Sequence, residues 1–548
     1  MTLFTVPMAA ILLLLVAAVF LVPRIRSKSR FPPGPPTLPF IGNLHQMPTS
    51  KAFLSYQEWS TTHAASSSGL LGFHLGPSAK LLVLHKWEQV RDLLDLRGAI
   101  YSDRPYVPAL DYALPPPHDQ HAAFTPYGPK WRRQRRTIDE FLRDRNAQLA
   151  PIQQAEGTQM VWDLLHHGRD CHDYMLRFSA AVILASVYGE RGRDGGPGSW
   201  SHRFFDGNER FADLLNSSSD PPPYGVFPWL RWLPAALDPW RGWKERALQL
   251  GREKRDLYGS LFNVARDEIR LGQRRDCFVA DILAENELAV EDGKPAYTED
   301  EMITLAGVLL EGGADTTALT FETFSLAMAA HPDVMRRAQE EIDRVYGGEM
   351  PQSADAKELP FLMACIFETM RFRPQFPTSI PHATTKDDTY RGYSIPKGTT
   401  VMMNVWALHH DPAEYEDPGS FVPERYLRNR FGTRHDHVES GQDDAKPQQG
   451  FRRDTWAFGA GRRACPGRRF AENTLLTLTA KALWAFDVVA LGQVDLDIRT
   501  GFKDALLIAP KECSFEFVVR GEEKRAVIEQ EWEKADRFLS RFEVRVGS

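Results

Sequence analysis

Residues 458–467 read Phe458-Gly459-Ala460-Gly461-Arg462-Arg463-Ala464-Cys465-Pro466-Gly467, and this stretch is suited to presenting one sulfur to a metal. A sulfur ligand must be a thiolate, which nearby cations and backbone N–H groups favour. Cys465 is bracketed by arginines, so we expect the local chemistry to favour its anion; they are Arg462, Arg463, Arg468 and Arg469. Gly461 and Gly467 allow tight turns. Pro466 suits the first position of a helix over 470–483, whose positive end would lie near the sulfur.

A free cysteine is usually a small buried apolar side chain, and Cys465 alone allows that interpretation. The spacing Phe-x-x-Gly-x-Arg-x-Cys-x-Gly, however, resembles the haem-ligand loop of the cytochrome P450 family. Other motifs extend this resemblance over nearly the whole chain after residue 30. It implies heme b (iron protoporphyrin IX) with the Cys465 thiolate as axial ligand of the iron, and Phe458, Gly461 and Arg463 as cofactor-binding residues of the same loop.

Composition places the chain among ordinary globular proteins. It has 548 residues, 43% of them hydrophobic and 25% charged, and a net charge of -6 that gives no support to nucleic-acid binding. The length alone favours several domains, but no linker-like break divides 31–519. The five cysteines are odd in number and scattered, which is unlike a disulfide framework and favours a reducing compartment.

The N-terminus predicts a membrane anchor. Residues 3–22 are almost wholly apolar and about long enough to span a bilayer. The basic residues that follow favour a cytosolic location for that flank; they are Arg24, Arg26, Lys28 and Arg30. A cleaved signal would carry its basic residues before the apolar run. The proline-rich segment 31–36 resembles the hinge of microsomal family members, so we expect a single-pass protein of the endoplasmic reticulum with a cytosolic catalytic domain.

The expected fold is mainly α with small β-sheets, the cytochrome P450 fold. Long stretches have apolar residues at helical spacing, whereas β-like runs such as 81–84 and 399–403 are few. We expect an anchor and basic flank over 1–30, a catalytic domain over 31–520 and a charged extension over 521–548. The extension has apolar residues at helical spacing, which favours a peripheral helix packed on the domain over a partner-binding element. Two polar stretches, 190–199 and 428–449, are expected to be surface insertions.

A long helix is predicted between Thr298 and His331. Thr298-Glu299-Asp300-Glu301 has the capping-box pattern, and Pro332 ends the run after about 33 residues. Its middle contains Gly312 and Gly313, each of which should cost about 1 kcal/mol relative to alanine. Paired glycines let a ligand approach the backbone; a kinked helix with a solvated acid is the alternative. Gly-Gly-x-Asp-Thr-Thr resembles the family's oxygen-binding signature, which implies Thr316 stabilising iron-bound hydroperoxide and Asp315 connecting it to a proton relay.

The haem propionates need cations or hydrogen-bond donors. The resemblance implies Trp131 and Arg135, spaced to share one helical face, together with His382 and Arg463. Simple packing of Trp131 and a loop hydrogen bond of His382 are the alternatives.

Two further charged groups are predicted. Glu368 and Arg371 share a helical face; an exposed pair is the default, but the resemblance implies a buried ion cluster that also contains Arg425. A group of basic residues resembles the family's docking surface, which implies an acidic NADPH-cytochrome P450 reductase as partner and cytochrome b5 as a further donor; individually solvated side chains are the alternative. The group consists of Lys130, Arg132, Arg133, Arg136, Arg468 and Arg469.

The aromatic segment 221–243 contains several tryptophans. It is either a buried connection or a patch at the membrane interface, where tryptophan is enriched.

Together these features predict a haem-dependent monooxygenase that oxidises an apolar organic substrate with O₂ and electrons from NADPH supplied through a reductase. The run 35–44 is most like fungal family members that tailor secondary metabolites. One alternative keeps the fold but catalyses oxidative coupling, desaturation or ring formation without oxygen insertion. Another is a haem sensor or carrier without turnover.

Overall fold

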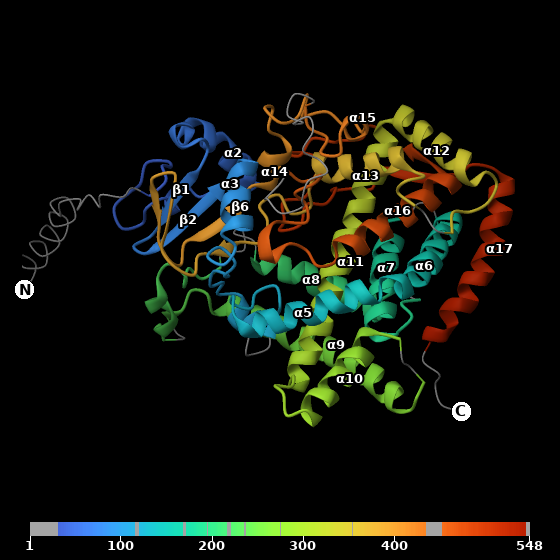
Figure 1. Cartoon of the computed structure of the whole chain (residues 1–548), viewed down its shortest axis with the longest axis horizontal. Coiled ribbons are helices and arrows are strands. Elements are labelled where there is room, and N and C mark those ends of the chain that lie inside the picture. The colour runs from blue at the N-terminus through green and yellow to red at the C-terminus, as the bar shows by residue number, and fades with distance from the viewer. Residues whose placement is uncertain are drawn as a thin grey trace, which may run out of the picture.

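The computed structural model describes residues 31–114, 120–167, 171–193, 195–215, 221–234, 237–273, 276–352, 355–434 and 452–543. Helices dominate this part of the chain, and the strands form three small sheets (Figure 1). The predicted fold class, mainly α with small β-sheets, is therefore confirmed.

The α-helices are α2 (Ala52–Thr62), α3 (Trp87–Val90), α4 (Leu110–Ala113), α5 (Pro129–Asp144), α6 (Asn146–His167), α7 (Cys171–Tyr188), α8 (Trp200–Leu215), α9 (Arg241–Arg270), α10 (Phe278–Glu291), α11 (Glu299–Ala330), α12 (Pro332–Tyr346), α13 (Pro360–Phe372), α14 (Val405–His409), α15 (Glu424–Arg428), α16 (Arg468–Ala485) and α17 (Glu522–Leu539). Shorter helical turns are η1 (Leu44–Gln46), η2 (Ala65–Ser67), η3 (Arg91–Leu96), η6 (Pro228–Trp232), η9 (Gly461–Arg463) and η10 (Ser540–Phe542).

The strands are β1 (Leu71–Leu75), β2 (Ala79–Leu84), β3 (His382–Ala383), β4 (Asp388–Tyr390), β5 (Tyr393–Ile395), β6 (Thr400–Met403), β7 (Phe486–Ala490) and β8 (Phe515–Val519). The largest sheet has the order β1-β2-β6-β3, with β2 parallel to β6 and the other neighbours antiparallel. Both predicted β-runs lie in it, side by side, with Leu81 opposite Thr400. This sheet lies at one end of the molecule, and most helices lie beyond it (Figure 1).

The central helix α11 begins and ends as its sequence predicts. Thr298 and Glu301 form the reciprocal capping box, in which the Thr298 hydroxyl accepts from the Glu301 N–H at 3.3 Å and the Glu301 carboxylate accepts from the Thr298 N–H at 3.0 Å. The helix stops at Ala330, and Pro332 opens α12. Helices α7, α9, α10, α12, α13 and α16 all contact α11. The helix is therefore the centre about which this part of the domain packs.

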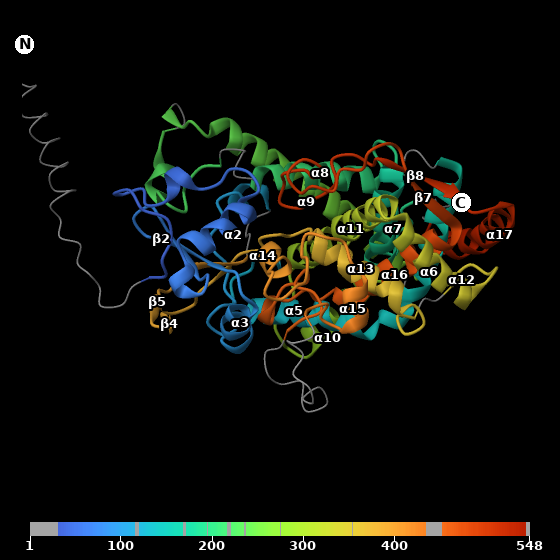
Figure 2. The same ribbon diagram turned by 90° about the horizontal axis from the view of Figure 1, so that it is seen from above.

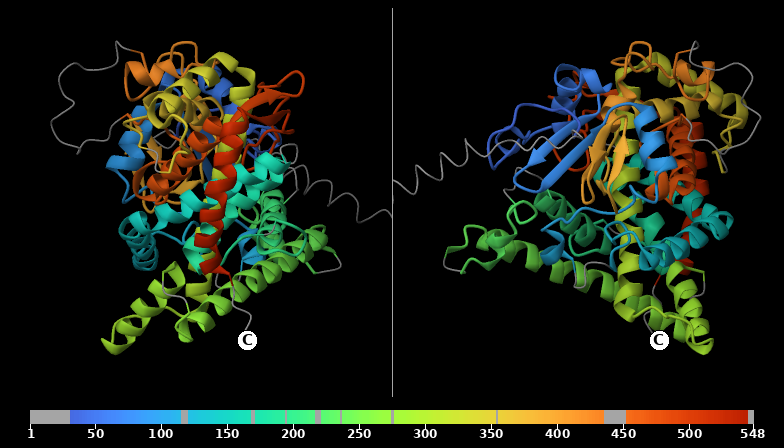
Figure 3. Two further views of the ribbon diagram at one scale, coloured as in Figure 1. Left: turned by 90° about the vertical axis from the view of Figure 1, so that its right-hand side faces the viewer. Right: turned by 60° about the vertical axis from the view of Figure 1, so that its left-hand side comes forward.

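Helix α17 confirms that residues after 520 form a helix packed on the domain. It lies along α6 on the outer face (Figure 3), and Trp532 stacks on Trp162 with ring centroids 4.6 Å apart. Arg191 pairs with Asp536 at 2.6 Å and with Glu543 at 2.7 Å. Arg191 is buried beneath these contacts, so the prediction that 190–199 is wholly a surface insertion is wrong at its start.

One part of the aromatic segment 221–243 is buried, as expected of a connection, and another part is exposed, as expected of a patch at the membrane interface. Tyr224 and Trp243 are buried, whereas Trp229 is 58% and Trp232 is 82% exposed. The segment lies beside the sheet that contains β2 (Figure 2), and Gly76 after β1 is in contact range of Val226.

The predicted anchor and basic flank, 1–30, and most of the polar stretch 428–449 lie outside the described residues. Within the described ranges, none of the helices has both the length and the apolar character needed to cross a membrane.

Candidate functional site

The loop before α16 presents Cys465 by folding back on itself. The Cys465 N–H donates to the Phe458 carbonyl at 2.8 Å, and Gly459 and Gly461 adopt φ of 73° and 65°. A side chain at Gly461 would meet the Leu94 carbonyl at 2.3 Å, so glycine is required there by both conformation and space. Gly467 is different, because its φ of -85° is open to any residue and it serves as the N-cap of α16. The prediction that Pro466 opens the helix is therefore wrong: the helix begins at Arg468.

The Cys465 side chain is exposed, yet the protein crowds it closely enough that burial raises the pKa of the thiol. The Gly467 N–H and the charges of Arg135 and Arg468 lower the pKa of Cys465, but they do not outweigh burial. Arg468 thus favours the anion as predicted, but the prediction that the local chemistry as a whole favours it is wrong for the protein alone. A metal ion removes this difficulty, because a coordinated thiol is deprotonated outright.

The predicted propionate residues gather beside this loop. The Arg463 guanidinium lies 4.2 Å from the Trp131 ring centroid and donates to the carbonyls of Ser102, Ala122 and Thr125. Arg135 donates to the Ala464 carbonyl at 2.6 Å and pairs with Asp139 at 2.8 Å. Helix α5, which carries Trp131 and Arg135 on one face, is therefore tied directly to the cysteine loop.

Arg104 is a member of this group that the sequence did not predict. Its guanidinium donates to the carbonyls of Ala123, Ile380 and Pro381. Burial lowers the pKa of Arg104 to about 10 and that of Arg463 to about 8, and Arg104 adds to the effect on Arg463. Within the described residues neither arginine forms an ion pair. Two crowded guanidiniums without a carboxylate partner are a site for anions, and this matches the propionates of a haem.

His382 lies in the same group. Burial and then the charge of Arg104 lower its pKa to about 3, so its ring is neutral at pH 7 and its Nδ1 hydrogen-bonds the Tyr101 carbonyl at 2.8 Å. His382 thus makes the loop hydrogen bond that was the alternative to a propionate contact. An anion placed beside the ring would favour its protonation and make Nε2 a donor.

On α11, the two glycines have different roles. A Cβ at Gly312 would meet no atom within 4 Å, so the helix presents its bare backbone to open space there. A Cβ at Gly313 would lie 2.5 Å from Ile183 Cδ1 of α7. The expectation of a close ligand approach thus applies to Gly312, while Gly313 serves helix packing.

Thr316 and Asp315 have separate partners. The Thr316 hydroxyl donates to the Gly312 carbonyl at 3.0 Å, and the Asp315 carboxylate accepts from the side-chain amide of Asn208 on α8. Burial raises the pKa of Asp315 to about 6. This acid is therefore half-buried and hydrogen-bonded, unlike the solvated acid of the alternative interpretation, and its pKa of about 6 lies close to neutral pH.

A buried ion cluster one turn earlier on α11 was not predicted. Glu311 contacts Lys254 of α9 at 2.9 Å and His121 at 2.8 Å, and it accepts from the Tyr258 hydroxyl at 2.6 Å. Burial opposes ionisation of Glu311, but the charges of Lys254 and His121 hold its pKa well below the usual range. Lys254 also reaches Asn208 at 3.4 Å, so the cluster connects to the partner of Asp315. The sequence signal for this cluster is an acid, Glu311, within an otherwise apolar stretch of the helix.

The predicted ion cluster near α13 is confirmed. Glu368 binds Arg371 at 2.8 Å and Arg425 at 3.1 Å, and all three side chains are at most 2% exposed. Arg371 also donates to three main-chain carbonyls, those of His409, Pro418 and Ser420. The cluster therefore fixes the segments between α14 and α15 against α13.

Only part of the predicted basic surface is exposed to a partner protein. Arg132, Arg136 and Arg469 are exposed. Lys130 and Arg133 pair with Glu301 at 3.3 and 3.4 Å, while Arg468 pairs with Asp454 at 2.6 Å and Glu472 at 2.8 Å.

Comparison with known proteins agrees with this site. A sequence model of the Cytochrome P450 family matches residues 32–517. The chain belongs to the cytochrome P450 family. The chain is similar to several fungal cytochrome P450 monooxygenases. One is macC of Penicillium terrestre, which is 32% identical over 542 residues that cover 96% of both chains. AOL_s00215g282 of Arthrobotrys oligospora is 33% identical over 527 residues, and acuD of Aspergillus aculeatus is 32% identical over 520 residues, each covering 93% of both chains. The protein is thus an oxidoreductase of the cytochrome P450 family, which implies haem with a cysteine thiolate ligand.

Proposed function

We propose that this protein is a membrane-anchored haem-thiolate monooxygenase that inserts one atom of O₂ into an apolar organic substrate. The observation that carries the proposal is the accessible Cys465 sulfur beside the guanidiniums of Arg104 and Arg463, neither of which pairs with a carboxylate among the described residues. Cys465 would hold the iron, and Arg463, Arg104, Trp131, Arg135 and His382 would surround the propionates. When bound, the haem supplies the activation of O₂.

Side chains of α11 would donate and accept protons at the site. The Thr316 hydroxyl, held by the Gly312 carbonyl, stands where α11 opens to space. Asp315, whose pKa of about 6 lies close to neutral pH, can release and regain a proton near it. Asn208 fixes the orientation of the Asp315 carboxylate.

The haem assignment is tested by Cys465→Ser, with Cys277→Ser as the matched control thiol. We expect Cys465→Ser to lose the carbon-monoxide-shifted Soret absorption of the haem-thiolate pigment, and Cys277→Ser to keep it. Retention of that absorption in Cys465→Ser would overturn the assignment.

Electrons would come from NADPH through NADPH-cytochrome P450 reductase, with cytochrome b5 as a possible second donor. The exposed Arg132, Arg136 and Arg469 support an acidic partner. Reversing their charge should slow reduction of the haem by the reductase, and the rate should depend less on salt than in the wild type.

We place the protein in the endoplasmic reticulum membrane, anchored by 3–22 with its catalytic domain in the cytosol. Exposed apolar side chains support a second contact with the bilayer: Trp229, Trp232 and Leu237 of the aromatic segment, and Leu38 and Phe40 near the start of the domain. A form lacking 1–30 should still bind vesicles, and replacing Trp229 and Trp232 by alanine should weaken that binding.

The relatives are fungal, which supports a role in fungal secondary metabolism. Deleting the gene in its host and comparing metabolites would identify the substrate as the accumulated precursor. Labelled O₂ separates insertion from the alternative of coupling, desaturation or ring formation, since only insertion leaves label in the product. Failure to consume NADPH with any substrate would favour a haem sensor or carrier.

A further inference from the structure

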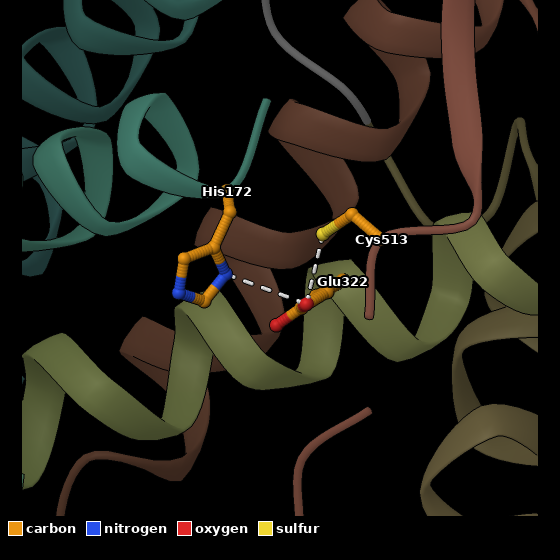
Figure 4. A group of neighbouring side chains, drawn as sticks. All are labelled: His172, Glu322 and Cys513. Carbon is orange, nitrogen blue, oxygen red and sulfur yellow. Dashed lines mark hydrogen bonds and ion pairs between the residues drawn. The ribbon is translucent and has the colours of Figure 1, made fainter. Parts of the chain in front are cut away.

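A second cluster of metal-binding side chains lies away from Cys465. His172 comes from the first turn of α7, Glu322 from α11 and Cys513 from the segment before β8, and their side chains converge on one point (Figure 4). His172 Nδ1 lies 3.4 Å from Glu322 Oε1, and Cys513 Sγ donates to the same oxygen at 2.9 Å. All three ligand atoms lie within 4.8 Å of one another.

Two of these separations, 3.4 and 2.9 Å, are close to those of a coordination shell, and the third pair of ligand atoms lies within 4.8 Å. With zinc bonds of about 2.0 Å to nitrogen and oxygen and about 2.3 Å to sulfur, tetrahedral ligand atoms lie about 3.3 to 3.8 Å apart. The observed contacts therefore need only small side-chain rotations to surround an ion.

The burial and charge of these side chains also favour a bound cation. The Glu322 side chain is 4% exposed, and among the described residues no lysine or arginine pairs with it. A buried carboxylate needs compensation, and among the described residues the side chains that contact Glu322 in this way are the His172 imidazole and the Cys513 thiol. The His172 side chain is 42% exposed, which leaves a route from solvent to the cluster.

We propose that His172, Glu322 and Cys513 bind a zinc ion. Thiolate, imidazole and carboxylate together are the ligand types of zinc, whereas carboxylate and carbonyl oxygens alone would favour magnesium or calcium. Water would complete the shell, or the buried Cys171 thiol, next to His172 in the chain, would supply the fourth ligand.

The ion would join three segments that are distant in sequence. Glu322 lies on α11 between Thr316 and the end of the helix, so zinc would fasten the central helix to α7 and to the strand β8. Because the metal binds the folded chain, it would stabilise the fold by an amount that grows with the logarithm of the free zinc concentration. The role is structural and independent of the iron at Cys465.

The test uses the full-length holoenzyme without a histidine tag, stripped with a chelator and titrated with Zn²⁺ alone. Elemental analysis should find one zinc for each haem iron, and the zinc K-edge absorption spectrum should show a mixed sulfur and nitrogen/oxygen shell. Cys513→Ser and His172→Ala should each lower the affinity for zinc at least about tenfold, while the control Cys277→Ser should bind as the wild type does. The melting temperature should rise with zinc in the wild type and in Cys277→Ser only.

Glu322→Gln provides a second variant of nearly the same shape, and an unchanged haem spectrum shows that each variant is folded. Absence of stoichiometric zinc in the wild type, or equal binding in all variants, would overturn the proposal. A Cys171–Cys513 disulfide found by mass spectrometry in enzyme isolated without reductant would also overturn it, because a disulfide sulfur does not ligate zinc.

Discussion

Ile183 of α7 packs directly against Gly313 of α11, so closely that a Cβ on Gly313 would lie 2.5 Å from Ile183 Cδ1 and 2.8 Å from Cγ1. Gly312, its neighbour, faces open space. Adjacent glycines on one helix thus meet opposite surroundings. One lets two helices approach, and the other leaves the backbone bare where we place the ligand site.

This contrast gives a pair of matched substitutions. Gly313→Ala gains up to about 1 kcal/mol of helix propensity but overpacks a buried contact at a cost of about 1 to 3 kcal/mol. We expect a net loss of about 1 kcal/mol in the free energy of unfolding, measured by urea denaturation followed by circular dichroism. Gly312→Ala should not lose stability, and its effect should appear in the haem spectrum. Equal stability of both variants would contradict the assigned packing.

Loss of Glu368 should be far more costly. Glu368→Ala leaves Arg371 and Arg425 buried without their carboxylate, which typically costs about 3 to 5 kcal/mol. We expect expression without stable haem incorporation, measured as the ratio of Soret to protein absorbance. Glu245→Ala is the control, since it breaks a helical pair with Arg241 whose side chains are 63% and 66% exposed. That change should cost no more than about 0.5 kcal/mol.

The C-terminal helix contributes to stability through Trp532. Trp532→Ala removes the stacked contact with Trp162 and the hydrogen bond to Gln159 at 3.0 Å. For a partly buried tryptophan we expect a loss of roughly 2 kcal/mol, measured as a lower melting temperature. Trp232→Ala, at an 82% exposed position, should leave the melting temperature unchanged. If both variants melt alike, α17 does not stabilise the domain.

Sequence reasoning succeeded where the signal is local. The capping box of Thr298 and Glu301 lies within four residues, and the turn at Gly461 is fixed by its neighbours in the loop. It failed at contacts between distant segments that no motif marks. Arg104 stands in no motif, and the contact of His121 with Glu311 joins positions 190 residues apart.

The pKa of Cys465 was mispredicted for a related reason. The flanking arginines are visible in the sequence, but burial, which outweighs their charges, depends on the folded protein.

Thr316→Ala should divert electrons to hydrogen peroxide while the haem spectrum is retained. The substitution removes a hydroxyl where α11 opens to space, so proton delivery fails and reduced oxygen escapes. The measurement is peroxide formed per NADPH consumed, in enzyme reconstituted with reductase and substrate. Thr316→Ser should restore coupling. Thr304→Ala is the control, because Thr304 makes the same type of hydrogen bond, to the Asp300 carbonyl at 2.8 Å, elsewhere on the helix.

Asp315 should make stability depend on pH in a predictable direction. Burial raises its pKa from 3.8 to about 6, so between these values the folded state binds more protons than the unfolded state. Stability from this group therefore falls as pH rises through the window, by at most about 3 kcal/mol. Asp315→Asn keeps an oxygen that can accept from Asn208 but cannot ionise.

The stability of Asp315→Asn relative to the wild type should accordingly increase from pH 4 to pH 6 and level off above, since the penalty of ionising the buried carboxylate is by then complete. Urea denaturation at a series of pH values measures the difference directly and cancels the contributions of other carboxylates. A difference that stays flat across this window would show that Asp315 has an ordinary pKa. It could then not exchange a proton near neutral pH, and the proposed role of this acid beside Thr316 would be lost.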